Sequence, residues 1–139
     1  MTPEELDAMT DDELRIKAAE LDGWTQCASR GGDGVTGVPS QEWLDRNSDE
    51  FGPYGILHYI PEYLDDIETA WGLWARLREE GWYCMVRNGS MGGGKLSRSR
   101  ETTVLLWHEE HNSINVVEPD DKAAPRAITK AFIWAREPA

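Results

Sequence analysis

Residues 62–87 read EYLDDIETAWGLWARLREEGWYCMVR and contain the clearest helical pattern in the chain, followed directly by a strand pattern. The helical part carries one apolar stripe at spacings of three and four residues, made by Tyr63, Ile67, Ala70, Trp71, Trp74 and Leu77. Acidic residues crowd its first turn, Arg76 and Arg78 lie in its last turn, and Gly81 follows, an order that the helix dipole favours. The sequence therefore predicts a helix over about 62–80.

Three strand patterns and a last helix follow this helix. Residues 82–87 and 102–108 are apolar at both alternating sets of positions, and 113–118 is a shorter strand that a turn at 111–113 joins to the second. Strands that are apolar on both faces need cover on both faces. A helix over about 123–135, with Pro125 in its first turn, supplies part of this cover. These elements predict an α+β fold, a three-layer α/β/α sandwich with a small, mainly antiparallel sheet.

The N-terminal half is less regular. Thr2 and Thr10 are each followed three residues later by glutamate, and the second of these capping signals predicts a helix over about 11–21 that Gly23 ends. Residues 28–56 contain six glycines and two prolines, which predict a long glycine-rich loop. With 139 residues, the chain is expected to form a single domain.

Composition excludes several classes of protein. A net charge of −12 opposes attraction to nucleic acid. The chain has no apolar run long enough to span a membrane and no secretory signal at its start, so we expect a cytoplasmic protein. Two cysteines are too few for a disulfide framework.

The charge is unevenly distributed along the chain. Residues 1–80 carry 6 basic and 19 acidic side chains, whereas residues 81–139 carry 8 basic and 7 acidic ones. Within the second part, Arg87, Lys95, Arg98 and Arg100 form a stretch without any acidic residue. We expect one cationic loop on an otherwise anionic protein.

This cationic stretch contains part of a phosphate-binding motif. Gly89, Gly94 and Lys95 have the required spacing, but Leu96 stands where the motif needs Ser or Thr, and a strand pattern follows instead of a helix. The stretch is therefore not expected to hydrolyse nucleotides. Backbone amides exposed by glycine, beside the basic side chains, can still hold an anion.

Other chemical patterns are weaker. His108 and His111 are three residues apart at a strand end, whereas the helical zinc motif needs a spacing of four. Neither Cys27 nor Cys84 has a histidine close by in the sequence, and no Gly-x-Ser-x-Gly motif is present. The sequence predicts no catalytic residue, no metal site and no cofactor.

Several stretches are similar to a known family. Residues 63–71 and 77–82, the opening at 9–14, and the alanine-rich start of the last helix at 123–128 resemble the phage ABA sandwich domain, a family of small phage and prophage proteins. The resemblance implies the sandwich fold and a phage origin, and it carries over no catalytic residue.

Two functions of different classes remain open. The first is a non-enzymatic binding protein that sequesters an anionic nucleotide, an immune signal of the host bacterial cell. The candidate ligand-binding residues are the cations Arg87, Lys95, Arg98 and Arg100 and the stacking rings Trp24, Trp43 and Trp107. The alternative is a protein-binding inhibitor or adaptor that acts through the acidic first half. A homodimer is also open, because two-fold dimers are the commonest symmetric oligomers.

Overall fold

The computed structural model describes residues 2–29, 34–47, 56–88, 101–119 and 123–136. It is an α+β fold with two separate three-stranded antiparallel sheets. Five helices and six strands are described: α1 (Pro3–Ala8), α2 (Asp11–Asp22), β1 (Trp24–Ser29), β2 (Val35–Pro39), α3 (Gln41–Asn47), β3 (His58–Tyr59), α4 (Ile67–Glu79), β4 (Tyr83–Asn88), β5 (Thr102–His108), β6 (His111–Glu118) and α5 (Ala124–Arg136).

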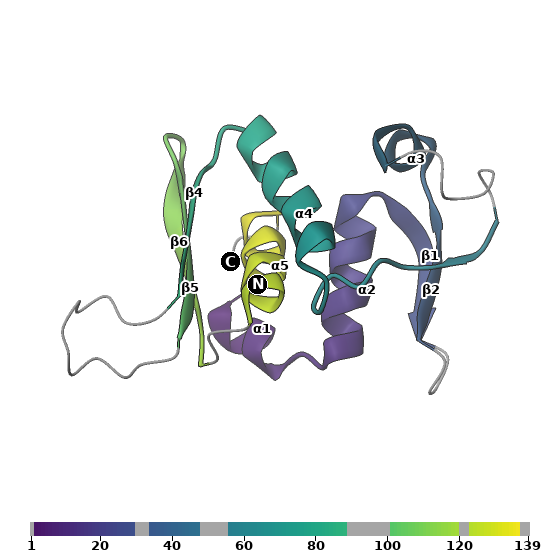
Figure 1. Cartoon of the computed structure of the whole chain (residues 1–139), viewed down its shortest axis with the longest axis horizontal. Coiled ribbons are helices and arrows are strands. Elements are labelled where there is room, and N and C mark those ends of the chain that lie inside the picture. Colours follow the sequence, from purple (N-terminus) through teal and green to yellow (C-terminus); the bar gives the residue numbers. More distant parts are fainter. Residues whose placement is uncertain (1, 30–33, 48–55, 89–100, 120–122, 137–139) are drawn as a thin grey trace.

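The helices lie between the two sheets. Figure 1 shows α1, α2, α4 and α5 in the middle, the sheet β4–β5–β6 on one side and the sheet β1–β2–β3 on the other. Helix α5 contacts β5 and β6 and also α4 and α2, while α2 contacts β1. The α+β class and the antiparallel pairing are confirmed. The predicted order of layers, with one sheet between helices, differs from the observed order, because β1, β2 and β3 form a second sheet on the far side of the helices.

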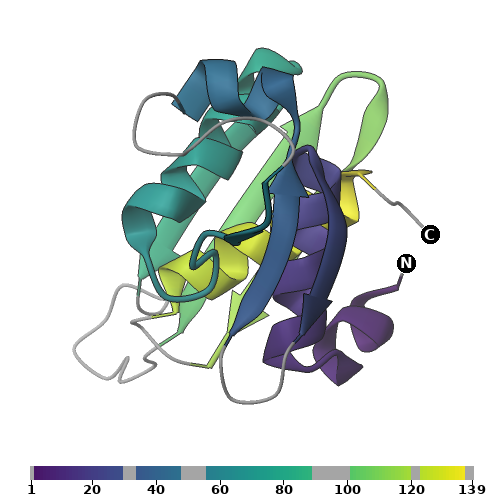
Figure 2. The same cartoon turned by 90° about the vertical axis from the view of Figure 1, so that its right-hand side faces the viewer.

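The N-terminal half is more regular than predicted. β1 and β2 pair antiparallel, and α3 follows directly, so the predicted loop over 28–56 is wrong for its described parts (Figure 2). Gly37 contributed to the loop prediction. In the sheet, this glycine allows the Cys27 side chain to lie close to the β2 backbone, since a Cβ atom at position 37 would be 2.8 Å from the Sγ atom of Cys27. Pairing of β2 with the preceding strand β1 and with the distant strand β3 overrode the local glycine signal.

The helices begin where side chains cap them. Thr2 and Thr10 each accept a hydrogen bond from the backbone N–H three residues later, so both capping signals start a helix, α1 as well as α2. Helix α4 begins at Ile67 and not at 62, because the Asp66 carboxylate accepts hydrogen bonds from the Glu68 N–H and the Thr69 hydroxyl. The other predicted elements are confirmed to within two residues at each end.

One face of the sheet β4–β5–β6 packs on the helices. Val104, Leu106, Ile114 and Val116 are buried on this inner face against α5, where Phe132 is fully buried. The opposite face is apolar as well, but no described element covers it: Tyr83 is 61% exposed, and Met85, Trp107 and Val117 are about half exposed. The expected cover on both faces is therefore absent within the described part of the chain.

Candidate functional site

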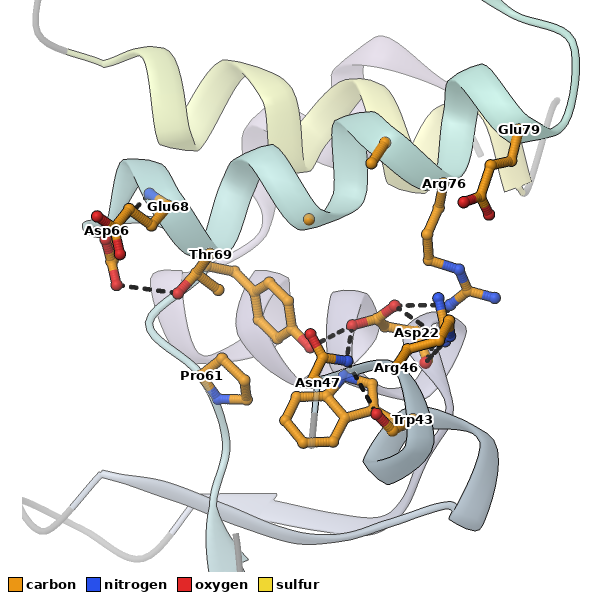
Figure 3. A pocket seen from close by; sticks show the side chains of 13 residues that line it. Asp22, Trp43, Arg46, Asn47, Pro61, Asp66, Glu68, Thr69, Arg76 and Glu79 are labelled. Carbon is orange, nitrogen blue, oxygen red and sulfur yellow. Dashed lines mark hydrogen bonds and ion pairs between the residues drawn. The ribbon is translucent and has the colours of Figure 1, made fainter. Parts of the chain in front are cut away.

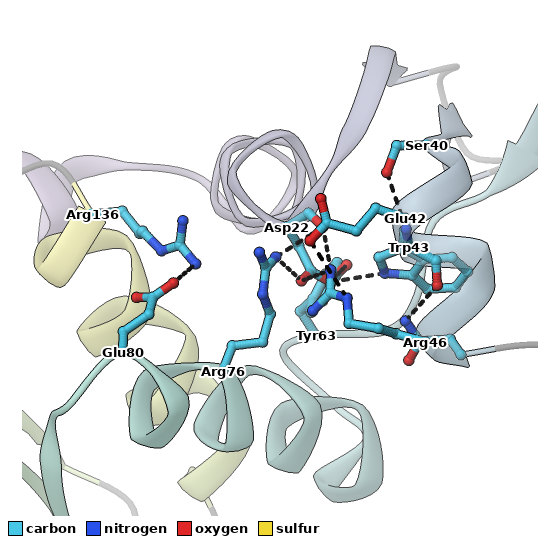
Figure 4. Close-up of polar contacts among 10 residues, drawn as sticks. Asp22, Ser40, Glu42, Trp43, Arg46, Tyr63, Arg76, Glu80 and Arg136 are labelled. Atoms are coloured by element: carbon cyan, nitrogen blue, oxygen red, sulfur yellow. Dashed lines mark hydrogen bonds and ion pairs between the residues drawn. The ribbon is translucent and has the colours of Figure 1, made fainter.

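A buried carboxylate joins four segments of the chain. Asp22, the last residue of α2, is 6% exposed. Its Oδ2 atom accepts hydrogen bonds from Trp43 Nε1 at 2.9 Å and from the Tyr63 hydroxyl at 2.8 Å, and its Oδ1 atom lies 2.6 Å from a guanidinium nitrogen of Arg76 (Figure 4). Arg46 lies further away, at 3.9 Å from Oδ1. We call these five residues the Asp22 cluster.

The position of Asp22 explains why two arginines gather there. The C-terminal end of a helix carries partial negative charge, so an acidic residue at that end is unfavourable unless cations compensate it. Arg76 also donates to the backbone carbonyl of Asp22 at 3.0 Å, and Arg46 donates to it at 3.4 Å. The two guanidiniums therefore neutralise both the carboxylate and the helix end.

The phenol of Tyr63 stays protonated in this setting. Burial, followed by the charge of Asp22 and the hydrogen bond to it, raises the pKa of Tyr63 well above its usual value. The protonated hydroxyl is a hydrogen-bond donor to the carboxylate at any pH near neutrality. The cluster is thus a polar network in which the Asp22 carboxylate accepts from Trp43, Tyr63 and Arg76.

A cavity of about 510 Å³ lies beside the Asp22 cluster, between α4 and α3 (Figure 3). This volume is in the range of small-molecule sites. Its lining comprises Asp22, Trp43, Arg46, Asn47, Pro61, Tyr63, Asp66, Glu68, Thr69, Gly72, Ala75, Arg76 and Glu79. We call it the α3–α4 pocket.

The two ends of the pocket differ in charge. Arg46 and Arg76 lie at one end and share the single buried carboxylate of Asp22. Asp66 and Glu68 lie at the other end, at the start of α4. Glu68 and Arg76 are eight positions apart on α4, which is about 12 Å along a helix. Because four carboxylates and two guanidiniums line the pocket, its overall charge is negative, and Glu79 lies beside Arg76 at the end that holds both guanidiniums (Figure 3).

Gly72 leaves open space in the wall of the pocket. It lies in the middle of α4, and a Cβ atom added there would have no neighbour within 4 Å. Its φ angle is not positive, so the backbone does not require glycine either. Glycine inside a helix costs about 1 kcal/mol relative to alanine. Glycine therefore occupies, despite this loss of helix stability, a position where a side chain would narrow the pocket.

The residues predicted to bind an anion are only partly brought together. Lys95, Arg98 and Arg100 lie outside the described residues. Arg87 and Trp107 lie on the same outer face of the sheet β4–β5–β6, but the pairs Arg87–Thr103 and Tyr83–Trp107 are four residues apart along β5, or about 13 Å.

Two of the three predicted stacking rings are core residues. Trp24 and Trp43 are 2% and 3% exposed, and their rings meet edge to face with centroids 5.0 Å apart. The prediction that Trp24 stacks on a ligand is wrong, because its ring is enclosed between α2 and the sheet β1–β2–β3. Trp43 does line the α3–α4 pocket, but as a wall residue whose indole N–H is bound to Asp22. Only Trp107 is substantially exposed, at 48%.

The histidine turn has a structural role. The backbone N–H of Glu110 donates to His108 Nδ1 at 3.0 Å, so the proton is on Nε2, which lies 3.2 Å from the Glu80 carbonyl oxygen. The imidazole therefore links the β5–β6 turn to the end of α4. Among the described residues, no group of three or more histidine, cysteine, aspartate or glutamate side chains could hold a metal ion.

Both cysteines are expected to resist thiol reagents in the native protein. Burial raises the pKa of Cys27 and of Cys84 from 9.0 to about 11. At pH 8 the native thiols should react at least tenfold more slowly with a disulfide reagent such as DTNB than the same thiols in urea. The raised pKa values also mean that the free energy of unfolding falls as pH rises from about 9 to about 11. In this range the thiols of the unfolded chain lose their protons while those of the native protein keep them, which favours the unfolded state. Equal reaction rates in native and unfolded protein would contradict this.

The chain matches no protein-family model, no curated protein and no solved structure at a significant level. The resemblance to the phage ABA sandwich domain therefore stays a prediction. No helix in the described part of the chain combines the length and apolar character needed to cross a membrane.

The sequence contains one signal for the Asp22 cluster that belongs to none of the motifs. Asp22 directly precedes the helix-ending Gly23, a position that disfavours an acidic side chain. Such a residue needs cations from elsewhere in the fold, but the sequence does not say which of the arginines supply them.

Proposed function

We propose that this protein is a non-enzymatic binding protein for a small molecule with a single anionic group, held in the α3–α4 pocket. The observation that carries the proposal is the convergence of Arg46 and Arg76 at one end of a cavity large enough for a ligand. The two guanidiniums share the buried carboxylate of Asp22, and Arg46 also lies 3.9 Å from Glu42, so an anion would be held there by guanidinium N–H donors and not by an excess of positive charge. Arginine presents several N–H donors in a fixed plane, so donors remain for a phosphate or carboxylate.

The charge of the lining limits the class of ligand. Asp66, Glu68 and Glu79 would repel a molecule that carries several phosphates. A nucleoside cyclic monophosphate carries one negative charge, and its base offers amino or imide hydrogens that can be donated to the Glu68 carboxylate, about 12 Å from Arg76 along α4. This ligand class retains the nucleotide signal inferred from the sequence but moves its site from the 88–100 segment to the pocket. In this proposal the protein acts inside a host bacterial cell and sequesters the ligand without turning it over.

The proposal is tested by calorimetric titration with the 3′,5′-cyclic monophosphates of adenosine, guanosine, cytidine and uridine. Arg46→Gln should weaken binding by about ten- to a hundredfold, because a hydrogen bond to a charged group is lost. Gly72→Leu should reduce binding by at least tenfold by filling the cavity. Gly72→Ala should leave most of the binding intact and add up to about 1 kcal/mol of stability.

Asp45→Ala is the matched control, because Asp45 lies on α3 but does not line the pocket. It should bind like the unchanged protein. Absence of heat from all four probes at protein concentrations of about 100 µM would overturn the proposal. Equal binding by the Gly72→Leu variant would also overturn the assignment to this pocket.

A second candidate is a protein-binding inhibitor or adaptor that acts through its acidic surface. It rests on the acidic side chains of α1 and α2, among which Glu4, Glu5, Asp11 and Glu13 are exposed. The negative electrostatic potential of these side chains would steer the approach of a basic partner. Binding by this route would be insensitive to Gly72→Leu, which separates the two functions.

A further inference from the structure

The outer face of the sheet β4–β5–β6 presents aromatic and aliphatic side chains to solvent. Its residues are Tyr83, Met85 and Arg87 from β4, Thr103, Leu105 and Trp107 from β5, and Asn115 and Val117 from β6, of which Thr103 is buried among its neighbours. We call this set the aromatic face. The rings of Tyr83 and Trp107 lie side by side across the strands, with centroids 5.1 Å apart. Tyrosine, tryptophan and arginine are the residues that contribute most to binding energy in protein interfaces.

The exposed area of the aromatic face is in the range of an interface. Tyr83 is 61% exposed, and Met85, Trp107 and Val117 are 48–49% exposed. For side chains of this size, these fractions correspond to roughly 400 Å² of apolar surface. Two such faces packed together, with the polar residues at their edges, bury about 1,000 Å², which is the lower limit for a specific complex.

The face is self-complementary about its middle row. Three rows of residues cross the strands, and the middle row is Met85 and Leu105. The row of Tyr83 and Trp107 lies two residues from the middle row in one direction along the strands. The row that contains Arg87 lies two residues from it in the other direction. The cation and the rings are therefore equally far from the middle row, about 7 Å on either side.

We propose that two copies of this chain form a symmetric dimer through their aromatic faces, with strands antiparallel across the interface. A two-fold axis that runs across the strands at the Met85–Leu105 row brings Arg87 of each protomer onto the partner subunit's Tyr83 and Trp107. Each dimer then contains two cation–π contacts between an arginine and an aromatic pair. Met85 and Leu105 meet their own copies at the axis.

Charge favours a second copy in this orientation. The chain carries a net charge of −12, but Arg87 is the one formally charged side chain among the residues of the aromatic face. The β5–β6 turn beyond Trp107 carries Glu109 and Glu110, both exposed. The antiparallel arrangement brings Arg87 toward the partner subunit's Glu109 and Glu110, whereas a parallel arrangement would bring the four glutamates together. Opposite charges in register select one orientation over the other.

The test is sedimentation velocity of the full chain over a range of concentrations up to about 200 µM. We expect a dimer that dissociates on dilution. Met85→Lys should raise the dimer dissociation constant by at least a hundredfold, because the two lysines would face each other at the axis. Arg87→Glu should raise it by at least tenfold through loss of the cation and repulsion by the glutamates.

Tyr59→Ala is the matched control for Tyr83→Ala, because Tyr59 is equally exposed, at 63%, but lies on β3 in the other sheet. Tyr83→Ala should weaken the dimer, and Tyr59→Ala should not. Combining Arg87→Glu with Glu109→Arg and Glu110→Arg should restore association, because the charges are exchanged between the two ends of the face. A monomer at all concentrations, or a dimer that Met85→Lys leaves intact, would overturn the proposal. Failure of the charge exchange would overturn the antiparallel orientation.

Discussion

Asp22→Asn is expected to lower the free energy of unfolding by about 3–5 kcal/mol, the usual loss when one member of a buried ion pair is removed. The Asp22 carboxylate accepts hydrogen bonds from Trp43, Tyr63 and Arg76, and an amide replaces one of its two acceptor oxygens with a donor. The guanidinium of Arg76 would remain partly buried without its counter-charge. Urea unfolding followed by tryptophan fluorescence measures the change.

Asp65→Asn is the matched control for this substitution. Asp65 also forms an ion pair with an arginine, Arg15, at 2.6 Å, but its side chain is 70% exposed. Exposed ion pairs contribute about 0–1 kcal/mol, so the control should change stability little. If Asp22→Asn cost no more than Asp65→Asn, the Asp22 cluster would not be a main support of the fold.

A second buried ion pair is expected to give a strongly non-additive result. Glu118 at the end of β6 and Lys130 on α5 are 6% and 5% exposed, and their charged atoms are 2.5 Å apart. Lys130→Met alone should lower the free energy of unfolding by about 3 kcal/mol, because the buried Glu118 carboxylate loses its close counter-charge and keeps the more distant Arg126, at 3.8 Å. The change also removes the contact from Lys130 to Asp7, which ties α1 to α5.

The double variant Glu118→Leu/Lys130→Met should recover most of the loss. Replacing both charges with apolar side chains of similar size removes the buried charge instead of leaving it unpaired, and such exchanges are often neutral or stabilising. A double-mutant cycle measured by urea unfolding should therefore give a coupling of at least about 2 kcal/mol. Additive effects of the two single changes would show that the pair does not act as a unit.

The two proposals use different parts of the molecule. The α3–α4 pocket is lined by residues of α3 and α4, whereas the aromatic face belongs to the sheet β4–β5–β6, which lies on the other side of α4 from α3 (Figure 1). Gly72→Leu should therefore leave the dimer intact, and Met85→Lys should leave the pocket able to bind. Each result can fail without affecting the other.

The sequence determined the elements whose pattern is local. Helix α4 and helix α5 follow from apolar stripes of helical period, and β5 follows from a run of β-branched and aromatic residues, because these patterns need no information from distant parts of the chain. Capping by Thr2 and Thr10 is equally local. The predicted start of α4 at 62 was less accurate, because residues 63–65 form a turn and the helix begins only after the Asp66 cap.

Only the tertiary structure decided which residues meet. The pairing of β2 with β3, the place of the helices between two sheets, and the burial of Trp24 and Trp43 depend on contacts between segments far apart in the sequence. The same holds for the Asp22 cluster, whose members come from α2, α3, α4 and the segment before α4. The residue types along the chain show which groups, such as Asp22, need a partner when buried. The chain contains many arginines and aromatic rings, so only the packing of the folded chain decides which of them become those partners.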